Sequence, residues 1–237
     1  MEKEAVLKFA DMVDELAKIN PDYGRKLFFT TPENLKNKIL NDIDRVEEID
    51  KIMPNVDRST KGKLSREKGL ILEEIAGQIL NIRNVYTKHD RVLCDSNEID
   101  LVMQPSTNNC IYERFLPKYM REDFLVECKN HKKPIDVTLV GKFYSLVMYK
   151  SAKLGIMFTN QPLTGEHEWD AAIGLTKKLN LKSKVIIINV TISEIKNILQ
   201  NNGVFIDLIS EKVNKIIYHT DFRSNISMHP AEKLMIN

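Results

Sequence analysis

The chain has 237 residues, a formal net charge of +2, 43% hydrophobic residues and 29% charged residues. This length accommodates one buried core with a smaller appended element, and the composition excludes the disordered and fibrous classes of protein. The nearly balanced charge excludes a protein that binds polyanions over its whole surface, so any contact with nucleic acid has to be local.

The three cysteines, Cys94, Cys110 and Cys128, lack the close paired spacing of a disulfide framework or a zinc knuckle. Such cysteine usage fits a reducing compartment. Acids interrupt the N-terminal residues where a signal peptide would have an apolar core, and no later stretch approaches the ~20 apolar residues of a membrane span. We therefore expect a cytoplasmic protein without a membrane partner.

Two amphipathic helices are predicted before residue 58. Apolar residues recur at helical spacing through residues 3–19, and we expect Pro21 to end this first helix. The second helix is expected to begin at Thr31 as its N-cap, with Pro32 in the first turn. Residues 1–58 are therefore interpreted as a helical N-terminal extension.

Residues 59–200 are interpreted as the main domain, and the polar, basic stretch 58–68 as a linker running into it. The basic residues of this stretch are either solvated or in contact with phosphates. The expected elements begin with a helix ending near Leu80, followed by the runs 85–87 and 91–94, a turn at 95–97 and the run 98–103, which together resemble a hairpin. Then follow strand 124–129, helix 137–150, strand 154–159, helix 168–179, strand 185–190 and helix 193–199. This alternation predicts an α/β fold. Residues 201–237 are left as a C-terminal appendage.

Two of the short strands carry side chains that point to a chemistry. In FLVECKN, Glu127 and Lys129 project from one face because side chains alternate along a strand. In NEIDLVM, the same alternation separates Asp100 from its apolar neighbours. If the two strands pair, Asp100 and Glu127 converge.

Phosphodiester hydrolysis uses this combination of groups. Two hard oxygen ligands hold Mg²⁺ against the scissile phosphate, while a nearby base or cation positions the attacking water. A structural alternative stays open, because Glu-x-Lys triplets are common by chance. Glu127 and Lys129 would then form an exposed ion pair of little energetic consequence, and Asp100 would only end a hairpin. The order of the surrounding elements favours the chemical interpretation.

With these motifs in this order, the sequence resembles the PD-(D/E)xK, restriction-endonuclease-like superfamily, and more narrowly its Mrr-like catalytic domain. The resemblance runs from about Lys63 to Leu199 and rests on GLILEEIA, NEIDLV, FLVECKN and LGIMFTN. It implies an αβββαβ core with a mixed central sheet flanked by helices. It also implies that Asp100, Glu127 and the main-chain carbonyl of Cys128 hold Mg²⁺, for which Mn²⁺ can substitute, and that Lys129 orients or activates water.

The family often contributes a further acid from its first helix, and Glu73 in GLILEE occupies the matching place. The alternative for Glu73 is an exposed helical glutamate, as we expect for Glu74. The sequence departs from the family in the long gap between Asp100 and Glu127, which contains STNNCIYERFLPKYMRED and is interpreted as an inserted loop or strand extension. It also lacks a recognisable DNA-reading helix.

The resemblance implies a Mg²⁺-dependent endonuclease acting on DNA, as the effector of a prokaryotic restriction or antiphage defence system. A single active site has to visit both strands of a duplex, so we expect either a homodimer or a subunit of a larger defence complex. Two alternatives stay open: a nuclease acting on RNA, and a non-catalytic scaffold that binds partners through its N-terminal helices. Metal binding would separate the scaffold from the enzymes.

Overall fold

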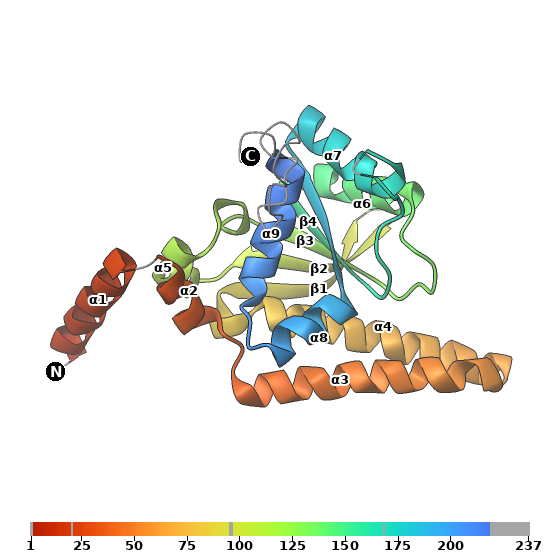
Figure 1. Ribbon diagram of the computed structural model, residues 1–237, viewed down its shortest axis with the longest axis horizontal. Coiled ribbons are helices and arrows are strands. Elements are labelled where there is room, and N and C mark those ends of the chain that lie inside the picture. The colour runs from red at the N-terminus through yellow and green to blue at the C-terminus, as the bar shows by residue number, and fades with distance from the viewer. Residues whose placement is uncertain (1, 20, 95–96, 168, 219–237) are drawn as a thin grey trace, which may run out of the picture.

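The computed structural model describes residues 2–19, 21–94, 97–167 and 169–218, with a five-stranded β-sheet between two layers of helices (Figure 1). The strands follow the order β1 (Tyr86–Cys94), β2 (Asn97–Pro105), β3 (Phe124–Lys129), β4 (Leu154–Thr159) and β5 (Ile186–Thr191). β1, β2 and β3 pair antiparallel, whereas β3, β4 and β5 pair parallel. The predicted α/β class, mixed sheet and hairpin are confirmed. Residues 95 and 96 of the expected turn lie outside the described residues.

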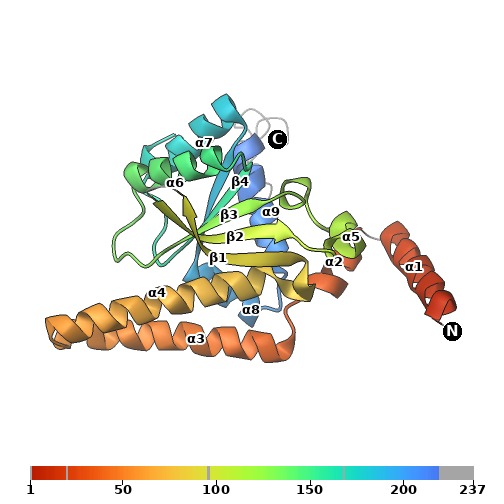
Figure 2. The ribbon, with the colours of Figure 1, turned by 180° about the vertical axis from the view of Figure 1, so that it is seen from behind.

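Helices cover both faces of the sheet (Figure 2). One face carries α6 (Val137–Tyr149) and α7 (Ala171–Ser183), and the other carries α4 (Arg58–Leu80), α8 (Ile192–Gln200) and α9 (Phe205–Tyr218). Two separate apolar clusters fill the two interfaces, and β4 and β5 are buried along their whole length. Strands buried on both faces are continuous apolar runs, which is why the sequence marks them clearly. The order α4-β1-β2-β3-α6-β4 is the expected αβββαβ.

Three helices precede α4: α1 (Glu2–Ile19), α2 (Pro21–Phe29) and α3 (Glu33–Ile52). Pro21 therefore opens a helix that the sequence analysis missed, consistent with the preference of proline for a first turn. The N-cap of α3 is Pro32, one residue later than expected, and it makes no side-chain capping bond. α3 is part of the main core, since Ile39 and Ile43 belong to the same buried cluster as Leu72 of α4.

The expected linker at 58–68 is wrong, because these residues form the first turns of α4. The carboxylate of Asp57 caps the helix by accepting hydrogen bonds from the main-chain N–H groups of Ser59 and Thr60. Leu64 and Lys68 are buried, and Lys68 Nζ forms an ion pair with Asp50 of α3 at 2.6 Å. α3 and α4 thus lie side by side as a helical hairpin that extends beyond the sheet (Figure 2).

The insertion between β2 and β3 contains α5 (Asn109–Tyr112) and two 3-10 turns. It packs against α2, where the Phe115 ring lies 4.9 Å from that of Phe28. The Tyr86 hydroxyl donates a hydrogen bond to the carbonyl of Met120 at 2.7 Å. Because the insertion leaves β2 at Pro105 and enters β3 at Phe124, it lies at the end of these strands away from Glu127.

The C-terminal part is helical beyond the expected apolar run 204–209, since α9 continues to Tyr218. α9 packs on the α4 side of the sheet through residues such as Phe205 and Ile209. The expected start of the helix at Glu168, and residues 219–237, lie outside the described residues. Among the helices that are described, none combines the length and apolar character needed to cross a bilayer.

Candidate active site

Glu127 and Lys129 lie on one face of β3, as the alternation of the strand predicts. Phe124 and Val126 face the apolar cluster on the α4 side, and Leu125 faces the cluster on the α6 side. Lys129 Nζ lies 2.5 Å from Glu127 Oε1. Glu127 is buried, with 8% of its surface exposed, so this contact is not an ion pair on the open surface.

Asp100 of β2 lies across from Glu127. Leu101 and Val126 are the last pair of the antiparallel register, and Asp100 and Glu127 are the next residues of their strands beyond it. The Asp100 carboxylate also accepts a hydrogen bond from the main-chain N–H of Cys128 at 2.6 Å. The two acids therefore converge at one end of the β2–β3 pairing.

Burial and mutual repulsion set the charges of these groups. Burial raises the pKa of Asp100, opposed by the Cys128 N–H and the Lys129 charge. Burial likewise raises the pKa of Glu127, and the charge of Asp100 raises it further. Burial alone would lower the pKa of Lys129, but the charge and hydrogen bond of Glu127 outweigh it and the pKa is raised. Lys129 is thus held as a cation between two acids that disfavour each other's ionisation.

Glu73 of α4 also faces this group. Burial raises the pKa of Glu73, and the neighbouring charge of Asp100 raises it further. Arg91 of β1 contacts Glu73 at 3.5 Å and Glu98 at 4.0 Å. Glu74, the next residue, instead bonds Lys38 of α3 at 3.2 Å. The structure therefore brings Glu73 toward Asp100 and turns Glu74 away toward Lys38.

Asp100 and Glu127 offer part of the donor set of a divalent cation. Glu127 Oε2 is buried and has no hydrogen-bond partner, which is costly for a carboxylate oxygen. Mg²⁺ takes one or two carboxylates and retains several waters, so Asp100 and Glu127 fit the donor set that it prefers. Over the described part of the chain, no three His, Cys, Asp or Glu side chains are placed together to hold a metal. A cation here would thus also need main-chain, water or phosphate oxygens.

Cys128 can contribute only its main chain to such a site. Its side chain is partly buried and packs against the apolar cluster on the α4 side. Burial raises the pKa of the Cys128 thiol well above its usual value, and the charges of Asp100 and Glu73 add to this effect. The thiol is therefore protonated at neutral pH and lies on the opposite face of β3 from the Glu127 carboxylate.

Sequence reasoning missed two features around the acids. Arg91 adopts a positive φ of 49°, next to the β1 positions that pair with β2 on either side of Asp100. Asn130, directly after Lys129, accepts a hydrogen bond from Asn160 at 2.6 Å and donates one to the carbonyl of Ser65 in α4 at 3.5 Å. No local sequence signal marks either feature, since both depend on elements distant in the chain.

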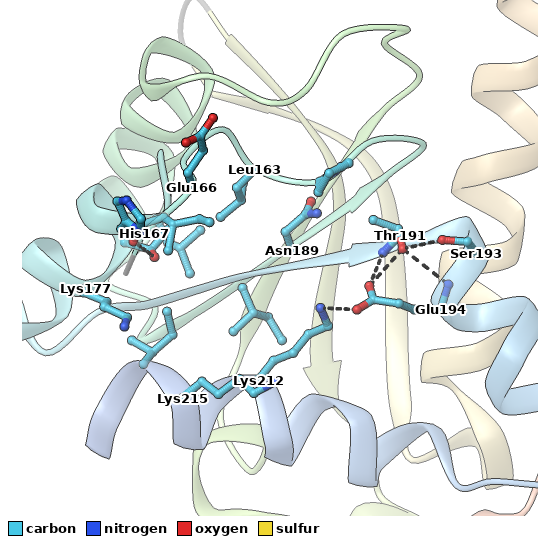
Figure 3. Close-up of a pocket in the computed structure, with 16 residues that line it drawn as sticks. Leu163, Glu166, His167, Lys177, Asn189, Thr191, Ser193, Glu194, Lys212 and Lys215 are labelled. Atoms are coloured by element: carbon cyan, nitrogen blue, oxygen red, sulfur yellow. Dashed lines mark hydrogen bonds and ion pairs between the residues drawn. The ribbon is translucent and has the colours of Figure 1, made fainter. Parts of the chain in front are cut away.

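A cavity of about 670 Å³ lies elsewhere, at the β5 edge of the sheet (Figure 3). Its walls come from the loop that carries Glu166, from β5 and from α9. Within it, the Glu194 carboxylate accepts a hydrogen bond from the Thr191 N–H at 2.9 Å and pairs with Lys212 at 2.6 Å. None of the four candidate residues, Asp100, Glu127, Lys129 and Glu73, lines this cavity.

No protein-family model matches the sequence, and no curated protein matches it significantly. Among solved structures, metal-depleted Ecl18kI in complex with uncleaved, modified DNA matches with 13% identity and a TM-score of 0.34, covering 75% of this chain and 54% of that one. Metal-depleted Ecl18kI in complex with uncleaved DNA matches with 12% identity and a TM-score of 0.38, covering 97% of this chain and 89% of that one. The chain thus spans about half the length of the first Ecl18kI chain. Likenesses this distant assign no activity, ligand or partner to this chain.

Proposed function

We propose that this chain is a Mg²⁺-dependent nuclease of the PD-(D/E)xK class, Mrr-like in its motifs, that hydrolyses phosphodiester bonds in DNA. One observation carries the proposal: Glu127 binds Lys129 through one oxygen, while its other oxygen is buried without a partner beside Asp100. A structural ion pair needs neither the second acid nor the unsatisfied oxygen. Both features are useful where a hard cation and a phosphate bind.

The roles of the residues follow from their charges. Bound Mg²⁺ would supply a Lewis acid for the scissile phosphate and lower the pKa of a bound water. Asp100 and Glu127 supply carboxylate oxygens, with the Cys128 carbonyl as a third ligand. Lys129 is cationic at neutral pH because Glu127 raises its pKa. It therefore acts as a hydrogen-bond donor that orients the attacking water and the phosphate oxygen, rather than as a base.

Glu73 is placed to assist from α4, either through a bound water or by orienting the acids. Direct attack of water on phosphorus gives 5′-phosphate and 3′-hydroxyl ends. A second copy of the chain, or another subunit, would supply the cut in the second strand of a duplex. The Mrr-like motifs suggest a restriction or antiphage defence system as the setting.

The experiment is to incubate the purified chain with duplex DNA, single-stranded DNA and RNA, in Mg²⁺, Mn²⁺ or chelator. We expect DNA cleavage that requires the metal and is lost in Glu127→Gln. Glu122→Gln is the matched control, because Glu122 is exposed and precedes the same strand. Cleavage in chelator, or a fully active Glu127→Gln protein, would contradict the proposal. Cleavage of RNA alone would replace DNA as the substrate, and metal binding without cleavage would favour the scaffold.

A further inference from the structure

A basic segment of α4, used by no step of the proposed mechanism, leads into the candidate site. It contains four exposed cations, Arg58, Lys61, Lys63 and Arg66. None of the four forms an ion pair with another residue in the described part of the chain. Four acids in the later part of the adjoining α3 are, by contrast, paired with Lys196, Arg45 or Lys68: Asp44, Glu47, Glu48 and Asp50. The end of the α3–α4 hairpin therefore carries an excess of positive charge.

Helical spacing aligns part of this segment with Glu73. Steps of four, four, three and four positions lead from Arg58 through Gly62, Arg66 and Gly69 to Glu73. Residues three and four apart share a helix face, so these five form one continuous line. We call Arg58, Gly62, Arg66 and Gly69 the α4 track. Arg58 and Glu73 are 15 positions apart, which is about 22 Å along the helix axis.

The α4 track is open to a neighbouring molecule. A Cβ atom added at Gly62 or at Gly69 would meet no other atom within 4 Å, so neither glycine is required by packing inside the chain. A glycine within a helix costs about 1 kcal/mol relative to alanine. Close approach of another molecule's backbone is an ordinary reason to keep glycine at such positions.

The middle of the α4 track is fixed to the strand that carries the candidate site. Asn130 donates its hydrogen bond to the carbonyl of Ser65, which precedes Arg66, and Asn130 itself follows Lys129. The loop after β3 adds two further exposed cations, Lys132 and Lys133. Positive charge thus lies on both α4 and this loop, with the acids near them.

We propose that the α4 track binds the phosphate backbone of duplex DNA and guides it to the Asp100–Glu127 site. Arg58 and Arg66 lie about 12 Å apart along the helix, the length over which one DNA strand presents three to four phosphates. Guanidinium groups pair well with phosphate oxygens. The α4 track has no aromatic side chain on which single-stranded bases would stack, which favours a duplex. The statement that the DNA is guided to the Asp100–Glu127 site rests on the proposed function. Binding of DNA to the α4 track does not itself require a metal.

The test measures binding of a fluorescent DNA duplex in chelator at several NaCl concentrations. Arg58→Gln/Arg66→Gln should weaken binding roughly tenfold or more, similarly for different sequences, and should reduce the slope of log K against log salt by about 1.8. Lys178→Gln/Lys182→Gln on α7 is the matched control, since it removes two exposed charges distant from the candidate site. It should leave the slope unchanged.

A second pair of variants separates binding from folding. Gly62→Ala and Gly62→Glu should both stabilise α4, because the new side chain meets open space. Only Gly62→Glu should weaken DNA binding, through its charge and bulk. Equal affinities of these two variants would count against the α4 track.

The outcomes separate this inference from the proposed nuclease. Unchanged affinity and slope in Arg58→Gln/Arg66→Gln would overturn the α4 track even if the parent protein cleaves DNA. Binding that depends on the α4 track, without Mg²⁺-dependent cleavage by the parent, would support the track and reject the nuclease. Dependence seen with an RNA duplex but not with DNA would overturn the choice of DNA.

Discussion

The carboxylate of Asp100 accepts a hydrogen bond from the main-chain N–H of Cys128 at 2.6 Å, which fixes the acid of β2 to the backbone of β3. The same β3 backbone carries Glu127 and Lys129. The relative positions of the three side chains are therefore set by two paired strands, which hold a site more accurately than loops do. Because an amide oxygen can also accept this hydrogen bond, a substitution at position 100 can separate the effect on stability from the effect on metal binding.

Asp100→Asn should abolish metal binding and cleavage without loss of stability. The amide oxygen can still accept the hydrogen bond from Cys128, but the charge is gone. Because burial raises the pKa of Asp100, the ionised carboxylate is unfavourable in the folded protein. The free energy of unfolding of the metal-free variant should thus equal that of the parent or exceed it by up to about 2 kcal/mol. Calorimetric titration with Mn²⁺ and urea unfolding test both parts. Parental Mn²⁺ affinity in this variant would remove Asp100 from the metal site.

Lys129→Ala should retain the binding of metal and DNA yet cleave roughly 10²- to 10⁴-fold more slowly. The ammonium is expected to act chiefly in the transition state, so its loss should appear in the rate of cleavage. Single-turnover cleavage and Mn²⁺ titration on one preparation provide the measurement. Lys132→Ala is the control from the adjoining loop. A folded Lys129→Ala protein that cleaves at the parental rate would show that this lysine has no catalytic role.

Glu73→Gln should reduce cleavage roughly tenfold, as the loss of a supporting carboxylate near a metal typically does. Glu74→Gln is a stringent control, because Glu74 is adjacent but bonds Lys38. Its loss should lower the melting temperature slightly and leave the cleavage rate unchanged. Cleavage rates and thermal unfolding of both variants separate these effects. Equal, small changes in cleavage would place Glu73 outside the site.

Glu194→Gln should destabilise the protein at pH 7, and less so as the pH falls towards 3. Burial would raise the pKa of Glu194, but Lys212 and the hydrogen bonds to Thr191 outweigh it, so the pKa is lowered. A lowered carboxyl pKa stabilises the fold above the unfolded pKa, and this stabilisation is lost as the pH falls through the folded pKa. The loss at pH 7 should be about 1 kcal/mol, typical of a helix cap. Urea unfolding at both pH values, with exposed Glu166→Gln as the control, measures it. An equal loss in the free energy of unfolding at pH 3 and pH 7 would show that the lowered pKa of Glu194 is not the cause.

The sheet and part of the candidate site were predictable from local patterns. The apolar runs of β4 and β5 mark strands buried on both faces, and strand alternation alone places Glu127 and Lys129 on one face. The meeting of Asp100 with Glu127 required only that β2 and β3 pair. The first two inferences depend on residues close together in sequence, whereas the third depends on the pairing of two strands on either side of the insertion.

The missed features depend on tertiary contacts or on ambiguous composition. Residues 58–68 are polar enough to suggest a linker, and their helical character comes from the Asp57 cap and from burial of Leu64 and Lys68 against α3. The contact of Arg91 with Glu73 joins β1 to α4 through an uncommon backbone conformation. Neither could be predicted from residue spacing.

The ion pair between buried Lys68 and partly exposed Asp50 has a structural consequence for the α3–α4 hairpin. Separating the two helices would remove the counter-charge of the Lys68 ammonium, which is only 2% exposed. The ion pair therefore holds the two helices to each other along the part of the hairpin that extends beyond the sheet. Nearer the sheet, residues of both helices such as Ile43 and Leu72 belong to the main core, so the base of the hairpin is fixed to the domain.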